Sequence, residues 1–263
     1  MKFLIYIISS SLLVSCATYI TAPKVYSKVS GVNDYSKAIK GNINEQGLVN
    51  FKAISQNQEP LNLYINFIAN HGLNSTPELF KDRNKLLAHY INSYNALSIF
   101  NVIESGFPDT NAGLKKVKFF VLNKFMIDGK RRSLRDYENN TIRKFGDPRV
   151  HFILNCMSIG CPLLPMSAVA PGGLNEFLEQ ATIKFFSEKR NLCLNHQNKT
   201  IHISSILDFF PEDFGGKDKI KDYVQKYSKE KLPEDYKIEY IPYDWTIIDM
   251  NKVSRVSVNP CQN

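Results

Sequence analysis

One segment of the chain, residues 75–106, is too apolar to lie on a protein surface. Its first four residues, STPE, supply a capping side chain, a first-turn proline and an acidic residue, which are typical of a helix start. Beyond Phe80, apolar residues cover all sides of the predicted helix as far as Gly106. We therefore expect a buried central helix around which the rest of the chain folds.

Two asparagines, Asn92 and Asn95, lie within this apolar segment beside Tyr90 and Tyr94. A buried amide must find hydrogen-bond partners or cost about 1–3 kcal/mol. Two interpretations follow. Both asparagines clamp loop backbone, or Asn95 points into a site as an orienting or oxyanion-stabilising group.

The remaining pattern mixes helices and strands. Apolar runs at residues 117–122 and 125–127 precede an Asp-Gly turn signal, and a second hairpin is predicted over residues 193–203. Helices are predicted from Ser133 to near Gly146 and over residues 174–186. An alternating strand over residues 238–245 contains the single tryptophan, Trp245, which we expect to anchor the core together with Tyr243. We predict one mixed α+β domain, residues 34–263, with the buried central helix packed on a mainly antiparallel sheet.

The chain begins with MKFLIYIISSSLLVSC, a lysine followed by a short apolar run. This run is too short for a membrane span and is typical of a secretory signal peptide, residues 1–15. Its end resembles a bacterial lipobox, which predicts lipidation of Cys16 and a tether over residues 16–33. Ordinary cleavage that discards Cys16 is the alternative. Ala17 is not an acidic inner-membrane retention residue, which by resemblance to proteobacterial lipoproteins favours the outer membrane. We therefore expect a lipid-anchored envelope protein that faces the periplasm.

The net charge of +8 does not predict nucleic-acid binding. The basic residues are dispersed and interleaved with acidic ones, whereas nucleic-acid binding calls for a basic face with stacking aromatic residues. A solvated face attracted to acidic envelope surfaces fits better. The expected partners are the membrane, through the anchor at Cys16, and a peptide or other envelope component.

The reactive side chains concentrate in residues 147–165, DPRVHFILNCMSIGCPLLP. Asp147-Pro148 indicates a turn, and residues 149–155 are predicted to form a buried strand. An extended strand would separate His151 from Cys156 by about 16 Å, so contact requires a sharp turn. That turn can instead bring Cys161 back toward the imidazole, and sequence order does not choose between the two thiols.

Three chemistries fit these residues. In the first, a thiol hydrolase or acyl-transferase, Cys156 is the nucleophile and His151 the base. Glu138 orients the imidazole, and Asn95 or a turn amide is the oxyanion donor. Cys161 is the alternative nucleophile or a disulfide partner.

The second is a non-catalytic envelope binding or scaffold module, in which disulfides such as Cys156–Cys161 and Cys193–Cys261 leave no reactive thiol. The third is a metal site built from His151 and the two thiols, with His196 or His202. Secreted thiols are more often oxidised than metallated, so we predict no metal and no cofactor.

Taken in order, several short blocks form a recognisable series. They are Asn92-Ser93-Tyr94-Asn95-Ala96, Ser133-Leu134 with Glu138 and Arg143, Asp147-Pro148-Arg149-Val150-His151-Phe152, Asn155-Cys156 with Ser158 and Gly160-Cys161-Pro162, Glu212-Asp213-Phe214, and Tyr243-Asp244-Trp245. This series resembles domain-of-unknown-function family 547, over residues 47–248. The family includes bacterial secreted proteins and lipoproteins and carries no established activity.

The chain departs from the family pattern at two places. His89-Tyr90 stands where the family usually has Phe-Trp, and Ser205 and Phe209 stand where it usually has Lys and Trp. Both departures concern substrate details. Papain-like and transglutaminase-like enzymes use a Cys, a His and an acid or amide in comparable roles, so we expect an arrangement of that type.

Overall fold

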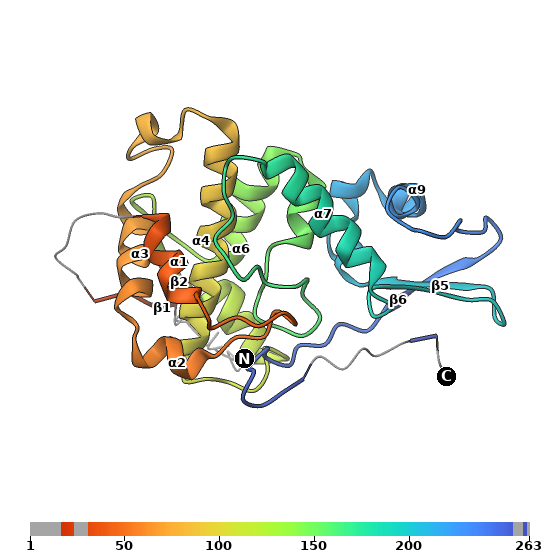
Figure 1. The fold of residues 1–263 in the computed structure, drawn as a ribbon, viewed down its shortest axis with the longest axis horizontal. Coiled ribbons are helices and arrows are strands. Elements are labelled where there is room, and N and C mark those ends of the chain that lie inside the picture. Colours follow the sequence, from red (N-terminus) through yellow and green to blue (C-terminus); the bar gives the residue numbers. More distant parts are fainter. Residues whose placement is uncertain (1–16, 24–30, 255–259, 262–263) are drawn as a thin grey trace, which may run out of the picture.

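A long helix, α4 (Arg83–Glu104), runs through the middle of the computed structural model, which describes residues 17–23, 31–254 and 260–261 (Figure 1). Every residue from 86 to 103 is buried, as the apolar pattern predicts. The helix starts later than expected, because Asp82 caps it by accepting a hydrogen bond from the Lys85 amide (2.7 Å). The predicted start forms the separate 3₁₀ helix η1 (Pro77–Phe80).

Three helices near the amino terminus pack around α4. They are α1 (Val32–Ile39), α2 (Phe51–Gln56) and α3 (Glu59–Asn70). The rings of Tyr35 on α1 and Tyr64 on α3 stack at 5.2 Å. A helical layer thus forms one side of the molecule (Figure 1).

A first sheet has the order β1-β2-β3, formed by β1 (Thr18–Tyr19), β2 (Asn123–Ile127) and β3 (Lys130–Arg132). The β2–β3 turn confirms the Asp-Gly signal, with positive φ at both Asp128 (50°) and Gly129 (73°). Strand β1 pairs in parallel with β2, so part of the predicted tether is joined to the domain. Cys16 and the predicted signal peptide lie outside the described residues.

A second sheet has the order β4-β5-β6, formed by β4 (Leu192–Asn195), β5 (Thr200–Ser204) and β6 (Lys237–Ile241). The predicted β4–β5 hairpin is confirmed, and β6 adds in parallel. A disulfide joins Cys193 on β4 to Cys261. Helix α7 (Leu174–Ser187) lies between this sheet and the helical layer (Figure 1).

Short helical segments make up most of the remaining structure. They are α5 (Leu114–Val117), η2 (Lys118–Leu122), α6 (Leu134–Tyr137), η3 (Glu138–Ile142), η4 (Arg143–Phe145), η5 (Pro148–Phe152), α8 (Ile206–Phe209), η6 (Pro211–Phe214), η7 (Lys217–Lys219) and α9 (Ile220–Gln225). The run at 117–122, which the sequence pattern placed before a hairpin, is therefore helical and not a strand.

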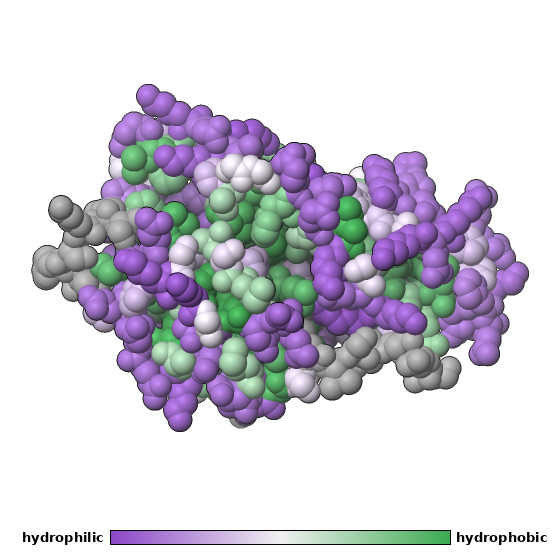
Figure 2. Space-filling model, viewed as in Figure 1, coloured by the Kyte–Doolittle hydropathy of each residue, from purple (hydrophilic) through white to green (hydrophobic). Residues whose placement is uncertain are grey.

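The α+β class is confirmed, but the expected sheet is not. Both sheets are small and mixed, and α4 packs mainly against other helices. Hydrophilic residues cover most of the rim of the face in Figure 2, with apolar residues gathered toward its middle. Across the described ranges, no helix is both long enough and apolar enough to span a membrane.

Candidate functional site

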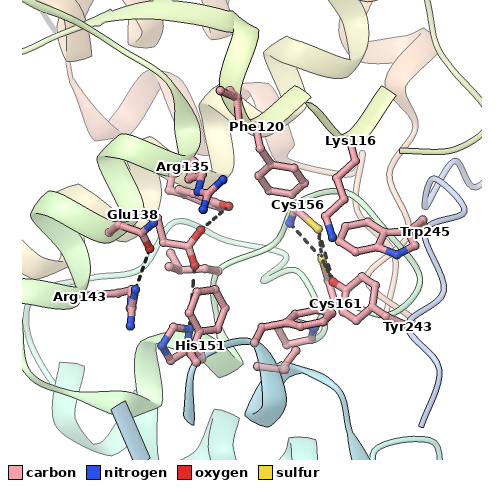
Figure 3. A pocket seen from close by; sticks show the side chains of 18 of the residues that line it. Lys116, Phe120, Arg135, Glu138, Arg143, His151, Cys156, Cys161, Tyr243 and Trp245 are labelled. Carbon is pink, nitrogen blue, oxygen red and sulfur yellow. Dashed lines mark hydrogen bonds and ion pairs between the residues drawn. The ribbon is translucent and has the colours of Figure 1, made fainter. Parts of the chain in front are cut away.

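A cleft of about 510 Å³ opens between α4, α5, η3, α8 and the segment that follows β6. His151, Cys156, Cys161 and Glu138, four residues that the sequence singled out, all line it. Figure 3 shows two groups of side chains. The thiols lie beside Tyr243, and the imidazole lies beside Glu138 and Arg143.

The imidazole is carried by a helix and not by the predicted strand. Pro148 occupies the first turn of η5, and the Asp147 carboxylate caps it by accepting from the Arg149 amide (3.0 Å). Within η5, Val150 packs into the main hydrophobic cluster and Phe152 into a second one near α7. His151 is thereby fixed where the two clusters meet.

Both ring nitrogens of His151 face carboxylates. Nε2 lies 2.6 Å from Oδ2 of Asp213, and Nδ1 lies 4.0 Å from Oε1 of Glu138. Phe210 stacks on the ring at 4.2 Å. The predicted orienting group, Glu138, is therefore present, but Asp213 makes the closer contact.

Asp213 comes from η6 and also binds Arg143. The guanidinium donates to both carboxylate oxygens, at 2.6 Å and 2.8 Å. Burial opposes ionisation of Asp213, but hydrogen bonds from His151 and Arg143 hold its pKa well below the usual range. Asp213 was not among the predicted site residues, although its Glu-Asp-Phe block was one of the recognised motifs.

Glu138 lies deeper and behaves in the opposite way. Its carboxylate accepts a hydrogen bond from the Tyr94 hydroxyl on α4 (3.1 Å). Burial raises the pKa of Glu138, and the nearby His151 lowers it only in part. The imidazole thus lies between two carboxyl groups whose pKa values are displaced in opposite directions.

The two thiols face each other across a tight loop. Their sulfur atoms are 2.8 Å apart, and the Cys156 amide donates to the Cys161 sulfur at 3.0 Å. Asn155 closes the loop, because its side chain donates to the Pro162 carbonyl (2.8 Å) and accepts from the Met157 amide (2.7 Å). Met157 has a positive φ of 62°, which reverses the chain between the cysteines.

Tyr243 completes the thiol group. Its hydroxyl lies 3.0 Å from the Cys161 sulfur and 3.4 Å from that of Cys156. Trp245 lines the same cleft and is only partly buried. Tyr243 and Trp245 pack against the main hydrophobic cluster, as expected, and their rings also form a wall of the cleft.

The surroundings separate the pKa values of the two thiols. Burial alone would raise the pKa of Cys161, but hydrogen bonds from Cys156, Tyr243 and the Ser158 backbone lower it to about 7. Burial raises the pKa of Cys156 well above its usual value, and the neighbouring Cys161 raises it further. Of the two, Cys161 is the better thiolate.

Asn95 supports the thiol loop and does not point into the cleft. Its side chain donates to the Ile153 carbonyl (3.1 Å) and accepts from the Asn155 amide (2.8 Å). Asn92 makes the same pair of bonds to Val169, at 2.8 Å each. Both asparagines are used as backbone clamps, which was one of the two interpretations of the sequence.

The other candidate ligands lie apart from the cleft. His196 bonds to Tyr236 (2.9 Å), and His202 on β5 lies 3.9 Å from Glu239. Within the part of the chain that the structure describes, no group of three or more His, Cys, Asp or Glu side chains is placed to hold a metal ion.

The site thus combines a thiol pair, an imidazole and the Glu138 carboxyl group in one cleft of an α+β domain, with Asp213 bound to the imidazole. A family model described as "Protein of unknown function, DUF547" matches residues 77–186, which supports the expected domain family for this segment. The matched segment contains α4, His151, Glu138 and both thiols. No curated protein and no solved structure matches the chain.

Proposed function

We propose that this protein is a thiol-dependent hydrolase or acyl-transferase. The observation that carries the proposal is the convergence of Cys156, Cys161 and His151 on one cleft. A thiolate, an acid–base group and an ordering carboxylate are the parts that acyl transfer through a covalent intermediate requires.

The proposed reaction has two steps. A thiolate attacks the acyl carbon, the bond to the leaving group breaks, and imidazolium at His151 gives the leaving group its proton. Water or an acceptor then attacks the thioester, gives a proton to His151 and regenerates the thiolate. Because donors surround the Cys161 sulfur, we assign the attack to Cys161, in place of the Cys156 favoured by the sequence.

Asp213 and Glu138 divide the support of the imidazole. Asp213, ionised and bound to Arg143, holds Nε2 and stabilises imidazolium. Glu138 lies at Nδ1 and is bound to Tyr94, which also lines the cleft. Since both ring nitrogens face carboxylates, transfer of a proton to substrate requires the ring to leave one of them.

That same feature favours one alternative, a binding module without catalysis. A His151 held by Asp213 and Glu138 is satisfied without any substrate. The alternative predicts that the cleft binds an envelope component and turns nothing over.

Alkylation of the native, reduced protein distinguishes the thiol-dependent enzyme from the binding module. Iodoacetamide labelling, read by peptide mass, should modify Cys161 selectively near pH 7, and Cys161→Ala should abolish hydrolysis of an activated thioester. His151→Ala should slow turnover by at least about a hundredfold, while His202→Ala, outside the cleft, should not. Inert thiols together with no turnover of any activated ester or thioester would leave only the binding module.

We further propose that the protein is an envelope lipoprotein anchored through Cys16, most consistent with the outer membrane facing the periplasm. The apolar leader ending in Leu-Val-Ser-Cys supports this, and a disulfide between Cys193 and Cys261 suits an oxidising compartment. Cys16→Ala should lose both acyl label and membrane partition. Retention of both would place the anchor elsewhere.

A further inference from the structure

Lys116 places a positive charge at the thiol end of the cleft. Its Nζ lies 4.1 Å from the centre of the Trp245 ring and 5.4 Å from that of Phe209. Figure 3 shows this side chain reaching past Trp245 on the side of the cleft that holds the cysteines. The aromatic rings fix the position of the ammonium group without neutralising its charge.

The cleft also carries a surplus of positive charge at its lining. Among the residues that the structure describes, neither Lys116 nor Arg135 has a carboxylate partner. The acidic side chain of the lining, Glu138, is already engaged with Tyr94 and His151, and Asp213 behind the lining binds Arg143 and His151. An anionic ligand would therefore meet a complementary field at Lys116.

An apolar wall connects this charge to the thiols. The Trp245 ring lies 4.4 Å from that of Tyr243, and Phe120 packs edge-on against Trp245 at 6.1 Å. Tyr243 in turn contacts both sulfur atoms through its hydroxyl. Along this wall, the order is ammonium, aromatic rings, thiols.

We propose that the cleft binds carboxylates with an apolar or aromatic body, the carboxylate at Lys116 and the body against Trp245 and Tyr243. As a statement about substrates this rests on the proposed function, and it names their class as acyl compounds that carry a second, anionic group. In that orientation, the end of the ligand remote from the carboxylate points toward the cysteines.

The single tryptophan reports binding directly, without turnover. We would titrate the full mature chain with phenylpropionate and with the neutral phenylpropanol and follow Trp245 fluorescence. The carboxylate should bind about three- to tenfold more tightly than the alcohol, because one partly solvated ion pair is gained. Added salt should reduce that difference.

Two neighbouring lysines provide the matched variants. Lys116→Met should abolish the preference for the carboxylate, whereas Lys115→Met, one position away on α5 and outside the cleft lining, should retain it. Equal binding of acid and alcohol by the unaltered protein, equal effects of the two variants, or no fluorescence change with either compound would each overturn the inference.

This outcome is independent of the thiol chemistry. If the protein prefers the carboxylate but its cysteines are inert, the proposed binding site stands and the proposed reaction is wrong. If Cys161 is reactive but the carboxylate is not preferred, the proposed reaction stands and the proposed substrate class is wrong.

Discussion

Asp213 binds both Arg143 and His151 through one carboxylate, and this makes its contribution to stability depend on pH. Its pKa in the folded protein lies below the usual Asp value of about 3.9. The stabilisation is therefore complete above that value and is lost as the pH falls toward the folded pKa. Asp213→Asn should lower the free energy of unfolding at neutral pH by roughly 1–2 kcal/mol after allowance for solvent screening. Denaturant titrations should show that the difference in free energy of unfolding between this variant and the unaltered protein becomes smaller in acid.

Glu138 should show the opposite dependence. Burial raises its pKa, so the folded state favours the protonated carboxyl, and this contribution is present below the usual Glu value of about 4.3 and lost as the pH rises. In Glu138→Gln, the side chain can still accept from Tyr94. The free energy of unfolding of this variant, relative to that of the unaltered protein, should therefore be more favourable at neutral pH than in acid. The same trend for both variants would contradict the assigned pKa directions.

The Tyr243 hydroxyl should set the reactivity of the thiol pair. It is one of the donors that lower the pKa of Cys161 to about 7. Tyr243→Phe removes this donor, so the midpoint of iodoacetamide labelling against pH should rise by roughly one pH unit. Tyr240→Phe, on β6, serves as the control and should leave the midpoint unchanged. An unaltered midpoint in Tyr243→Phe would mean that the hydroxyl does not stabilise the thiolate.

Helix α4 holds the thiol loop through Asn95, so a change there should alter both stability and reactivity. Asn95→Ala leaves the buried Ile153 carbonyl and Asn155 amide without their partner, at a cost of about 2–4 kcal/mol. Thermal unfolding measures the loss. Asn92→Ala should cost a similar amount, because it breaks the equivalent pair of bonds to Val169.

The two variants differ in what they do to the cysteines. Since Asn95 bonds to the residue before Cys156, its loss should change the alkylation rate of the thiols in the folded protein. Asn92→Ala should leave that rate unchanged. Equal effects on alkylation would show that the clamp has no special role in the site.

Helix α4 and the Asp128-Gly129 turn could be predicted because their signals are local. A fully apolar helix and an Asp-Gly step need no information from distant residues. The run at 149–155 was assigned to a strand because a short apolar segment has no decisive period. In the fold, Pro148 and the Asp147 cap start the 3₁₀ helix η5, which ends at Phe152.

The candidate site could be predicted only where its residues are near in sequence. His151, Cys156 and Cys161 lie in one segment, and Glu138 lies shortly before it. Asp213 is 62 residues from His151, and Tyr243 is 82 residues from Cys161. Their contacts depend on how η6 and the segment after β6 pack against the η5 and thiol-loop region, which no local pattern encodes.

The disulfide ties the two ends of the carboxyl-terminal region together. Cys193 and Cys261 are 68 residues apart in sequence, so in the chain-entropy model their bond stabilises the fold by about 4 kcal/mol. Cys193→Ser should lower the midpoint of denaturant unfolding accordingly, and reduction of the unaltered protein should have a similar effect. Because the bridge lies outside the cleft lining, the reactivity of Cys161 should persist in this variant under conditions where it remains folded.

Strand β1 also bears on how far this protein can act from a membrane. Thr18 already pairs with Asn123, so with a lipid at Cys16, as proposed, less than about 8 Å of chain would separate anchor and domain. A domain anchored this closely would stay within a layer of the envelope no thicker than the domain. Its ligands would have to arrive at the bilayer surface, because the protein could not reach out to meet them.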